Sequence, residues 1–303
     1  MSAAAVRSGE ASMAVAVSFI GTGIMGGSMA GHLLAAGHPV HVHSRTRGKA
    51  EPLLARGATW HDTPESAASA ADVTITMLGL PSDVEQVYFG AAGSPGVIAA
   101  AAPGSLLIDM TTSSPRLAER IAAAAAALGS AAVDAPVSGG DIGARNATLV
   151  IMAGGDQQAF DRARPLLELL GKSVTRLGPA GSGQRCKLAN QVAVAVGMVA
   201  WCEALAAARA GGLDAAAVQQ VISGGAAGSW GLTNLAPRAL AGDFAPGFLV
   251  RHLVKDIHLA HEEAEAAGLD LPGLAVASRL YDSLQVAGHG DAGTQALLRH
   301  YGW

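Results

Sequence analysis

The sequence predicts an α/β domain with a mostly parallel sheet, followed by an all-α domain. Up to about residue 180, short apolar runs typical of buried strands alternate with helical patterns, and beyond that point the strand patterns disappear. The length of 303 residues also exceeds the usual span of one domain. We therefore expect an α/β domain over residues 15–180 and a helical domain over residues 181–303, preceded by a disordered extension over residues 1–14.

A glycine-rich turn follows the first predicted strand. The apolar run Val15–Ile20 leads into the turn, and a helical pattern over 28–36 and a second strand over 40–44 follow it. This order is typical of a Rossmann-type dinucleotide site, in which the first two glycines let the backbone approach a pyrophosphate and the third lets helix and strand pack closely. The alternative is a glycine-rich turn without a ligand. The residues expected to contact the cofactor here are Gly21, Thr22, Gly23, Ile24, Met25 and Gly26.

The end of the second predicted strand indicates which dinucleotide binds. NAD sites place a carboxylate there for the ribose hydroxyls, whereas NADP sites avoid that charge and supply arginine. In this chain the carboxylate is absent, and bidentate arginine chemistry suits a phosphate monoester. The sequence therefore favours NADP(H) over NAD(H), with a solvated basic loop as the alternative. The expected contacts are Ser44, Arg45, Thr46 and Lys49, with Arg47 nearby.

The ends of the later strands predict the remaining border of this site. Ligands of open α/β sheets lie beyond the carboxyl ends of the strands. The strands expected over 72–78 and 106–109 therefore place Leu78, Gly79 and residues 111–113 beside the cofactor. Further on, the turn at Ser138, Gly139 and Gly140 either exposes backbone N–H groups to a carboxylate or is an ordinary turn. Strands over 149–153 and 173–177 complete the predicted domain.

The helical pattern over 181–210 opens the second domain. Lys187, Asn190 and Gln191 lie three and four residues apart, so they share one face of this helix. A lysine at the edge of an apolar helix either lines a cavity or extends its ammonium to solvent. Because the helix begins at the domain boundary, where ligand clefts are common, we expect the first arrangement. Further helices are expected over 214–223, 229–241, 249–267, 272–286 and 291–300.

Composition and charge exclude several classes of function. A net charge of −4 gives no electrostatic footprint for nucleic acid, and no uninterrupted apolar run reaches the roughly 18 residues of a membrane span. The N-terminus lacks the apolar core of a signal peptide, so we expect a cytoplasmic protein. His258 and His261 lack the order of a zinc motif, and no other metal-ligand spacing occurs, which predicts no metal.

Four segments together resemble the β-hydroxyacid dehydrogenase family: 21–26, 134–140, 181–187 and 255–256. The resemblance extends from about Val15 to Tyr301. It implies that Lys187 is the catalytic acid/base and that Ser138, Gly139 and Gly140 hold a substrate carboxylate. It also implies that Asn190 or Gln191 contacts the substrate, and that Thr112 and Lys255 contact the nicotinamide half of the cofactor.

Within that family, residues 187–191, 222–229 and 244–248 are most similar to tartronate semialdehyde reductases (2-hydroxy-3-oxopropionate reductases). The chain departs from many members at three positions: Gln191 replaces an asparagine, Asn146 a glycine and Gly79 a proline. These departures leave open which amide contacts the substrate and weaken the assignment to one substrate.

The expected function is NAD(P)H-dependent reduction of a short carboxylated semialdehyde, with tartronate semialdehyde to glycerate favoured, or the reverse oxidation of a β-hydroxyacid. Alternative substrates are 3-hydroxyisobutyrate, succinic or glyoxylic semialdehyde, or an imine. A non-catalytic dinucleotide-binding scaffold is the alternative from a different class. The apolar helices of the second domain predict a homodimer or homotetramer.

Overall fold

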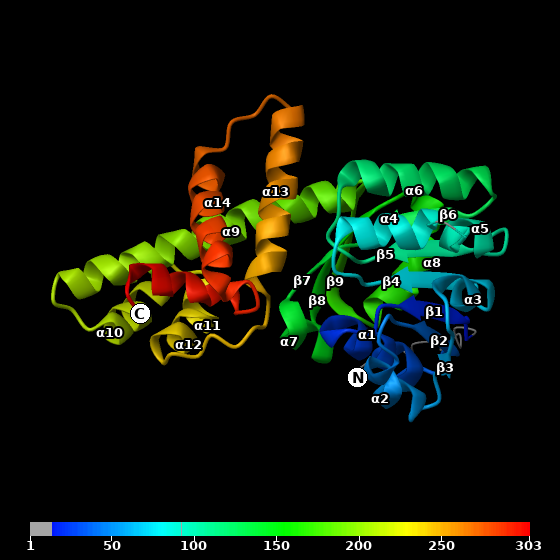
Figure 1. Ribbon diagram of the computed structural model, residues 1–303, viewed down its shortest axis with the longest axis horizontal. Helices are drawn as coiled ribbons and strands as arrows, with labels where there is room; N and C mark the ends of the chain where they lie inside the picture. Colours follow the sequence, from blue (N-terminus) through cyan, green and yellow to red (C-terminus); the bar gives the residue numbers. More distant parts are fainter. Residues whose placement is uncertain (1–13, 92) are drawn as a thin grey trace, which may run out of the picture.

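The computed structural model of the chain describes residues 14–91 and 93–303. The predicted disordered extension therefore lies outside the described residues, except for Ala14. Two bodies are visible in Figure 1, a sheet flanked by helices and a helical body, and the long helix α9 (Ser182–Ala210) reaches from one into the other.

Within the described residues, nine strands form one sheet in the order β3-β2-β1-β4-β5-β6-β8-β7, with β9 paired to β8. Strands β1 to β6 run parallel, β8 is antiparallel to β6 and β7, and β9 is parallel to β8. The order changes direction at β1 and β4, which is the switch point where open α/β sheets bind ligands. The strands are β1 (Val17–Ile20), β2 (Val40–His43), β3 (Thr59–Trp60), β4 (Val73–Thr76), β5 (Leu106–Asp109), β6 (Ala131–Asp134), β7 (Val137–Ser138), β8 (Leu149–Gly154) and β9 (Gly171–Gly178).

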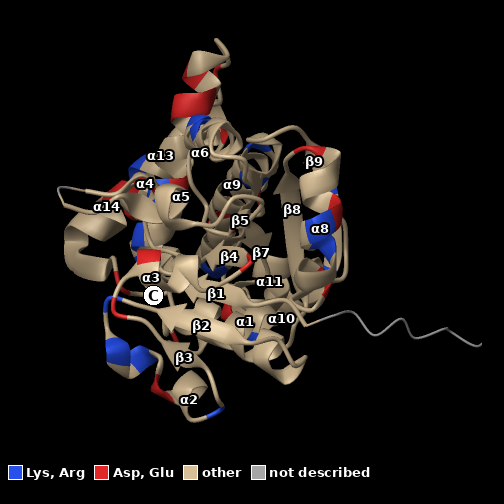
Figure 2. Cartoon of the chain, turned by 90° about the vertical axis from the view of Figure 1, so that its right-hand side faces the viewer, with Lys and Arg blue, Asp and Glu red and all other residues tan. Residues whose placement is uncertain are grey.

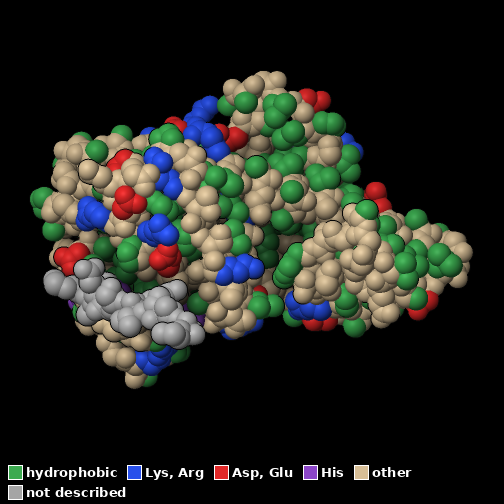
Figure 3. Space-filling view, turned by 180° about the vertical axis from the view of Figure 1, so that it is seen from behind, with side chains coloured by type: hydrophobic (Ala, Val, Ile, Leu, Met, Phe, Trp, Pro, Cys, Tyr) green, Lys and Arg blue, Asp and Glu red, His purple; other side chains and the backbone are tan. Residues whose placement is uncertain are grey.

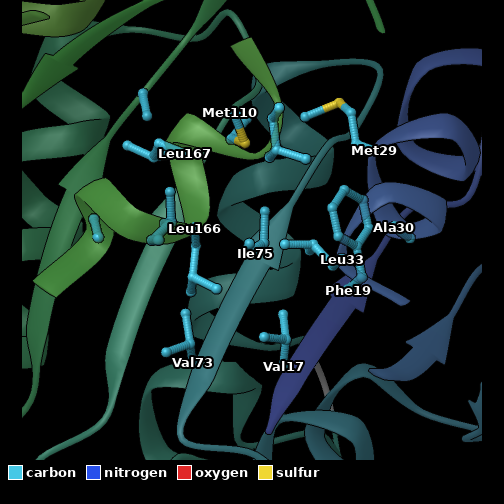
Figure 4. Packing of buried hydrophobic residues seen from close by; sticks show 14 of the residues in the cluster. Val17, Phe19, Met29, Ala30, Leu33, Val73, Ile75, Met110, Leu166 and Leu167 are labelled. Carbon is cyan, nitrogen blue, oxygen red and sulfur yellow. The ribbon is translucent and has the colours of Figure 1, made fainter. Parts of the chain in front are cut away.

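Helices cover both faces of the sheet because consecutive strand residues point to opposite sides. Phe19 packs with residues of α1 and α8 on one face, whereas Ile20 packs with residues of α3 to α6 on the other. Figure 4 shows the first of these cores, with Phe19, Met29 and Leu33 meeting between β1 and α1. The helices of this domain are α1 (Ile24–Ala35), η1 (Arg47–Lys49), α2 (Glu51–Leu54), α3 (Pro64–Ser69), α4 (Pro81–Phe89), α5 (Gly96–Ala100), α6 (Pro115–Ala127), α7 (Gly140–Arg145) and α8 (Gln157–Glu168).

The helical domain has a separate core around α9. Trp201, Cys202 and Leu205 of α9 are buried with Ile257 and Tyr281 from the C-terminal helices. Beyond α9, this domain contains α10 (Ala215–Ser223), α11 (Trp230–Asn234), α12 (Ala236–Leu240), α13 (Val250–Ala266), α14 (Pro272–Leu284), η2 (Gln285–His289) and η3 (Thr294–Tyr301).

The structure confirms the predicted fold class and differs from the sequence-based boundaries in a few places. The first helix begins at Ile24, within the glycine motif of residues 21–26, rather than at Ser28. The helix expected over 229–241 is divided at Leu235 into α11 and α12. Strands β3, β6 and β7 were not predicted, because β3 and β7 have two residues each and the Ala-rich β6 has a weak strand pattern.

Helix α9 is long and apolar enough, by length and composition alone, to cross a membrane, although charged residues interrupt it. Core helices of proteins in water meet the same criterion, and α9 packs against α13 and α14. The face of α9 turned towards these helices therefore belongs to the core of the helical domain, and its opposite face is exposed. The lobe formed by the helical domain shows few charged side chains on the face seen in Figure 3.

Close packing at the glycine turn predicts the effect of one substitution. A Cβ at Gly26 would lie 1.9 Å from the carbonyl oxygen of Gly21, whereas a Cβ at Gly27 would find Thr22 O at 3.5 Å, an ordinary contact. Gly26→Ala should therefore lower the free energy of unfolding by about 1–3 kcal/mol through overpacking. Gly27→Ala, the matched control, should raise it by up to about 1 kcal/mol through helix propensity. Urea unfolding followed by circular dichroism measures the free energy of unfolding of both variants. Equal changes in the two variants would contradict the close packing at Gly26.

Candidate active site

The glycine turn has the shape of a dinucleotide site. Gly21 has φ +99° and a Cβ there would lie 2.2 Å from Met77 O, so only glycine fits between β1 and β4. Gly26 packs against Gly21 and Phe19. At Gly23, by contrast, a Cβ would meet nothing within 4 Å among the described atoms, so the turn is open on the side where a ligand would approach.

Two unsatisfied groups at this turn fit the phosphates of a dinucleotide. Helix α1 has Gly23 as its N-cap residue, without a side-chain cap and without an acidic residue in its first turn. The hydroxyl of Thr22 is buried and has no hydrogen-bond partner among the described residues. Backbone N–H groups at a helix N-terminus bind anions, so the residues present fit a pyrophosphate.

The predicted residues at the strand ends meet across the domain boundary. The backbone N–H of Leu78 donates to Thr111 Oγ1 at 2.9 Å, which ties together the ends of β4 and β5. From the helical domain, Lys255 Nζ donates to Thr112 O at 2.6 Å. The structure therefore brings Leu78, Thr112 and Lys255 together, although they lie far apart in the sequence.

The predicted cofactor contacts after β2 lie at the surface. Ser44 is half-buried, whereas Arg45, Thr46 and Lys49 are exposed. Arg45 forms an ion pair with Asp83, 3.1 Å from Nη1 to Oδ1, at the start of α4. In Figure 2, the ribbon beside α2 is coloured blue where its residues are basic. The basic loop of residues 44–49 is thus accessible to a phosphate, and Asp83 pairs with Arg45.

Lys187 is 6% exposed and its ammonium is held inside the structure rather than in solvent. Its Nζ donates to Gln191 Oε1 at 2.9 Å, and Asn190 Nδ2 donates to the same oxygen at 2.8 Å. The polar patch predicted from helical spacing is therefore confirmed as a hydrogen-bonded group.

Asp256 of α13 fixes the orientation of the Gln191 amide. Gln191 Nε2 donates to Asp256 Oδ2 at 2.6 Å, and a carboxylate can only accept. Since the amino end must face Asp256, the amide oxygen must face Lys187. Asp256 also forms an ion pair with Lys255, 2.8 Å from Oδ1 to Nζ. The buried Asp256 carboxylate thus pairs directly with Lys255 and is linked to Lys187 through the Gln191 amide.

Burial lowers the pKa of Lys187 from its ordinary value near 10.5 to about 8. In this net value, the negative charge of Asp256 opposes the effect of burial, whereas the positive charge of Lys255 adds to it. A pKa near neutral pH lets an amine both donate and accept a proton, which is the property that general acid–base catalysis requires.

The turn at Ser138–Gly140 joins β7 to α7. Gly139 and Gly140 have φ +129° and +61°, so glycine is favoured at both positions. A Cβ at Gly140 would find Gly247 O at 3.7 Å, which places this turn against the 244–248 segment of the helical domain. No hydrogen bond in the described part of the chain joins Ser138, Gly139 or Gly140 to Lys187.

Sequence reasoning missed three buried residues that hold the site together. These are Asp134, Gln184 and Asp256, all at most 4% exposed. Burial raises the pKa of the Asp134 carboxyl to about 6, while the N–H groups of Gly181 and Gln184 act in the opposite direction. For Asp134 the available signal was a carboxylate at the end of an apolar strand, since such residues are rarely buried without a partner. Gln184 is uncharged, and Asp256 lies on a helix with many charged residues, so the sequence did not distinguish them.

The open side of Gly23 gives a direct test of cofactor binding. Gly23→Val should leave the thermal unfolding temperature of the free protein within about 2 °C, because a Cβ meets no described atom. It should weaken NADPH binding at least tenfold, because the side chain would fill the approach of the pyrophosphate to α1. Isothermal titration calorimetry measures the affinity, and Gly197→Val on α9, where a Cβ also meets nothing within 4 Å among the described residues, is the control. Unchanged affinity in both variants would contradict this site.

Comparison with known proteins identifies both domains. Residues 16–178 match the model for the NAD-binding domain of 6-phosphogluconate dehydrogenase. Residues 181–301 match the model described as NAD-binding of NADP-dependent 3-hydroxyisobutyrate dehydrogenase.

Full-length relatives have the same organisation. An uncharacterised oxidoreductase of Bacillus subtilis, YkwC, is 52% identical, covering 93% of this chain and 97% of its own. The 2-hydroxy-3-oxopropionate reductase of Escherichia coli is 40% identical, covering 93% and 95%. The NAD-dependent L-serine dehydrogenase of Pseudomonas aeruginosa is 36% identical, covering 91% and 94%.

The fold agrees with a solved member. The 3-hydroxyisobutyrate dehydrogenase of Mycobacterium tuberculosis, solved with L-serine, superimposes with a TM-score of 0.87 at 33% identity, covering 96% of this chain and all of that one. The chain therefore belongs to the β-hydroxyacid dehydrogenase family and is an oxidoreductase with a nicotinamide dinucleotide cofactor.

Proposed function

We propose that the protein reduces a short carboxylated semialdehyde, with tartronate semialdehyde to glycerate favoured, and that Lys187 is the general acid. The observation that carries this proposal is the buried Lys187 ammonium, held by Gln191 at the boundary of the two domains. The 40% identity to an enzyme named 2-hydroxy-3-oxopropionate reductase supports the choice of substrate.

The reduction adds a hydride and a proton to the aldehyde group, and the protein supplies the proton. When bound, the nicotinamide supplies a hydride to the aldehyde carbon. Lys187 donates a hydrogen bond to the aldehyde oxygen and then its proton, so that the developing alkoxide becomes a hydroxyl. A general acid of this kind contributes on the order of 10²–10⁴-fold to the rate.

The carboxylate and the carbonyl group of the substrate are proposed to contact different parts of the site. The backbone N–H groups of the Ser138–Gly140 turn are proposed to hold the substrate carboxylate. Gln191 already uses both ends of its amide, for Lys187 and Asp256. The half-buried Asn190 is therefore the better candidate for direct contact with substrate.

NADP(H) is the proposed cofactor, in preference to NAD(H). The exposed arginine and lysine side chains after β2, and the absence of a carboxylate at that position, support this choice. We further infer a homodimer or homotetramer, because apolar residues in the middle of α9, among them Val194, are exposed in the single chain. Multi-angle light scattering measures this assembly.

The central test combines substrates with a lysine variant. NADPH and NADH oxidation should be measured with tartronate, succinic and glyoxylic semialdehydes, and NADP⁺ and NAD⁺ reduction with 3-hydroxyisobutyrate and L-serine. Lys187→Met should lower kcat at least a hundredfold while NADPH affinity changes less than threefold, because the lysine acts on the substrate carbonyl.

The exposed Lys172→Met on β9 is the control and should retain wild-type kcat. A normal rate in Lys187→Met would exclude Lys187 as the acid. Preference for NADH would contradict the role of Arg45, and turnover of L-serine without turnover of semialdehydes would replace the proposed substrate.

The lowered pKa of Lys187 predicts opposite pH profiles in the two directions. Reduction requires the ammonium, so kcat/KM should fall as the pH rises through about 8. Oxidation requires the neutral amine, so kcat/KM should rise over the same range. Matching profiles in both directions would show that a different group controls the proton transfer.

A further inference from the structure

Gln184 lies on α9 three residues before Lys187 and therefore on the same helix face. Its side chain is fully buried. The amide oxygen accepts from the backbone N–H of Ser113 at 2.9 Å, and Nε2 donates to Thr111 O at 2.8 Å. Both ends of the amide are thus committed to one loop of the other domain, the segment 111–113 after β5, here named the cofactor loop.

The backbone of Gln184 is fixed as firmly as its side chain. Its N–H donates to Asp134 Oδ2 at 2.8 Å, and the N–H of Gly181 donates to Asp134 Oδ1 at the same distance. A Cβ at Gly183 would lie 2.4 Å from Met152 O, so the first turn of α9 is in direct contact with β8. The helix cannot slide along the sheet without breaking these contacts.

The cofactor loop is held on both sides of Thr112. Thr111 receives the N–H of Leu78 on its hydroxyl, and its own N–H donates to Asp109 Oδ1 at 3.0 Å. Thr112 O accepts from Lys255. Gln184 is therefore the direct link from this loop to the helix that carries Lys187.

We propose that Gln184 is a positioning residue that sets the distance between the cofactor loop and the Lys187 ammonium. This inference rests on the proposed role of Lys187 as the acid. Without the amide, Thr111 O and Ser113 N–H would be buried without partners, a state that proteins avoid by local rearrangement. A misplacement of about 1 Å is enough to cost on the order of 100-fold in rate.

Gln184→Met tests the proposal, because methionine has a similar volume and removes both hydrogen bonds. Gln219→Met is the matched control: Gln219 is also buried, and its Nε2 donates to Ser223 and to Leu232 O inside the helical domain. We expect kcat to fall 10–100-fold in Gln184→Met and less than twofold in Gln219→Met. With NADPH deuterated at the transferred position, the isotope effect on kcat should increase only in Gln184→Met. Equal kcat and equal isotope effects in the two variants would overturn the proposal.

Gln184→Glu supplies a second variant of nearly identical shape. The introduced carboxyl can replace both hydrogen bonds only when protonated, since its O–H then donates to Thr111 O and its carbonyl accepts from Ser113. The charged groups around this position are Asp109, Asp134, Lys187 and Lys255. The ratio of variant to wild-type kcat should rise as the pH falls from 8 to 6. A constant ratio would contradict a role for the donor end of the amide.

The NADPH affinity, measured by calorimetry, tests the role of Gln184 independently of the proposed reaction. If the wild type turns over none of the substrates, the assignment of the reaction fails, and NADPH affinity then decides the role of Gln184. Because the cofactor loop loses two of its bonds, Gln184→Met should bind NADPH at least threefold more weakly than Gln219→Met. Equal affinities would overturn the proposal independently of the substrate.

Discussion

Asp134 accepts two backbone hydrogen bonds from the first turn of α9, and the arrangement of the site depends on this contact. The carboxylate comes from the end of β6, so the sheet itself caps a helix of the other domain. A carboxylate at a helix N-terminus is favoured both by the free N–H groups and by the helix dipole. This cap precedes Lys187 by less than two helical turns. It therefore fixes the position of the lysine relative to β6 and to the neighbouring β5, which the cofactor loop follows.

A second group of charged and polar side chains surrounds Lys187. The buried Lys187, Gln191 and Asp256 and the half-buried Lys255 form one network, and the donors and acceptors of the Gln191 amide allow a single arrangement. Burial favours the neutral amine, whereas Asp256 favours the ammonium. The balance between these effects brings the lysine into the range in which it can exchange protons near neutral pH.

The sequence predicted those features whose pattern lies within one short segment. The glycine turn and the Lys187 patch are local patterns, and both were predicted correctly in their placement on the fold. Gln184 and Asp256 could not be assigned a role in this way, because their partners lie about 70 residues away in the chain. Strand β6 was missed for a related reason: its Ala-rich sequence takes its conformation from β5, with which it pairs. Local patterns therefore predicted the candidate site, whereas the contacts that orient its residues are visible only in the tertiary structure.

Helix α9 has its first turn bonded to the sheet and its later turns in the core of the helical domain. Rotation of the two bodies about residues 178–183 would have to break the Asp134 cap and the Gln184 bonds together. A hinge at the domain boundary is therefore disfavoured, even though sequence composition changes there. Substrate and cofactor would then exchange through movement of the loops that border the candidate site, such as the 244–248 segment, while Lys187, the proposed acid, and the strands move as one rigid unit.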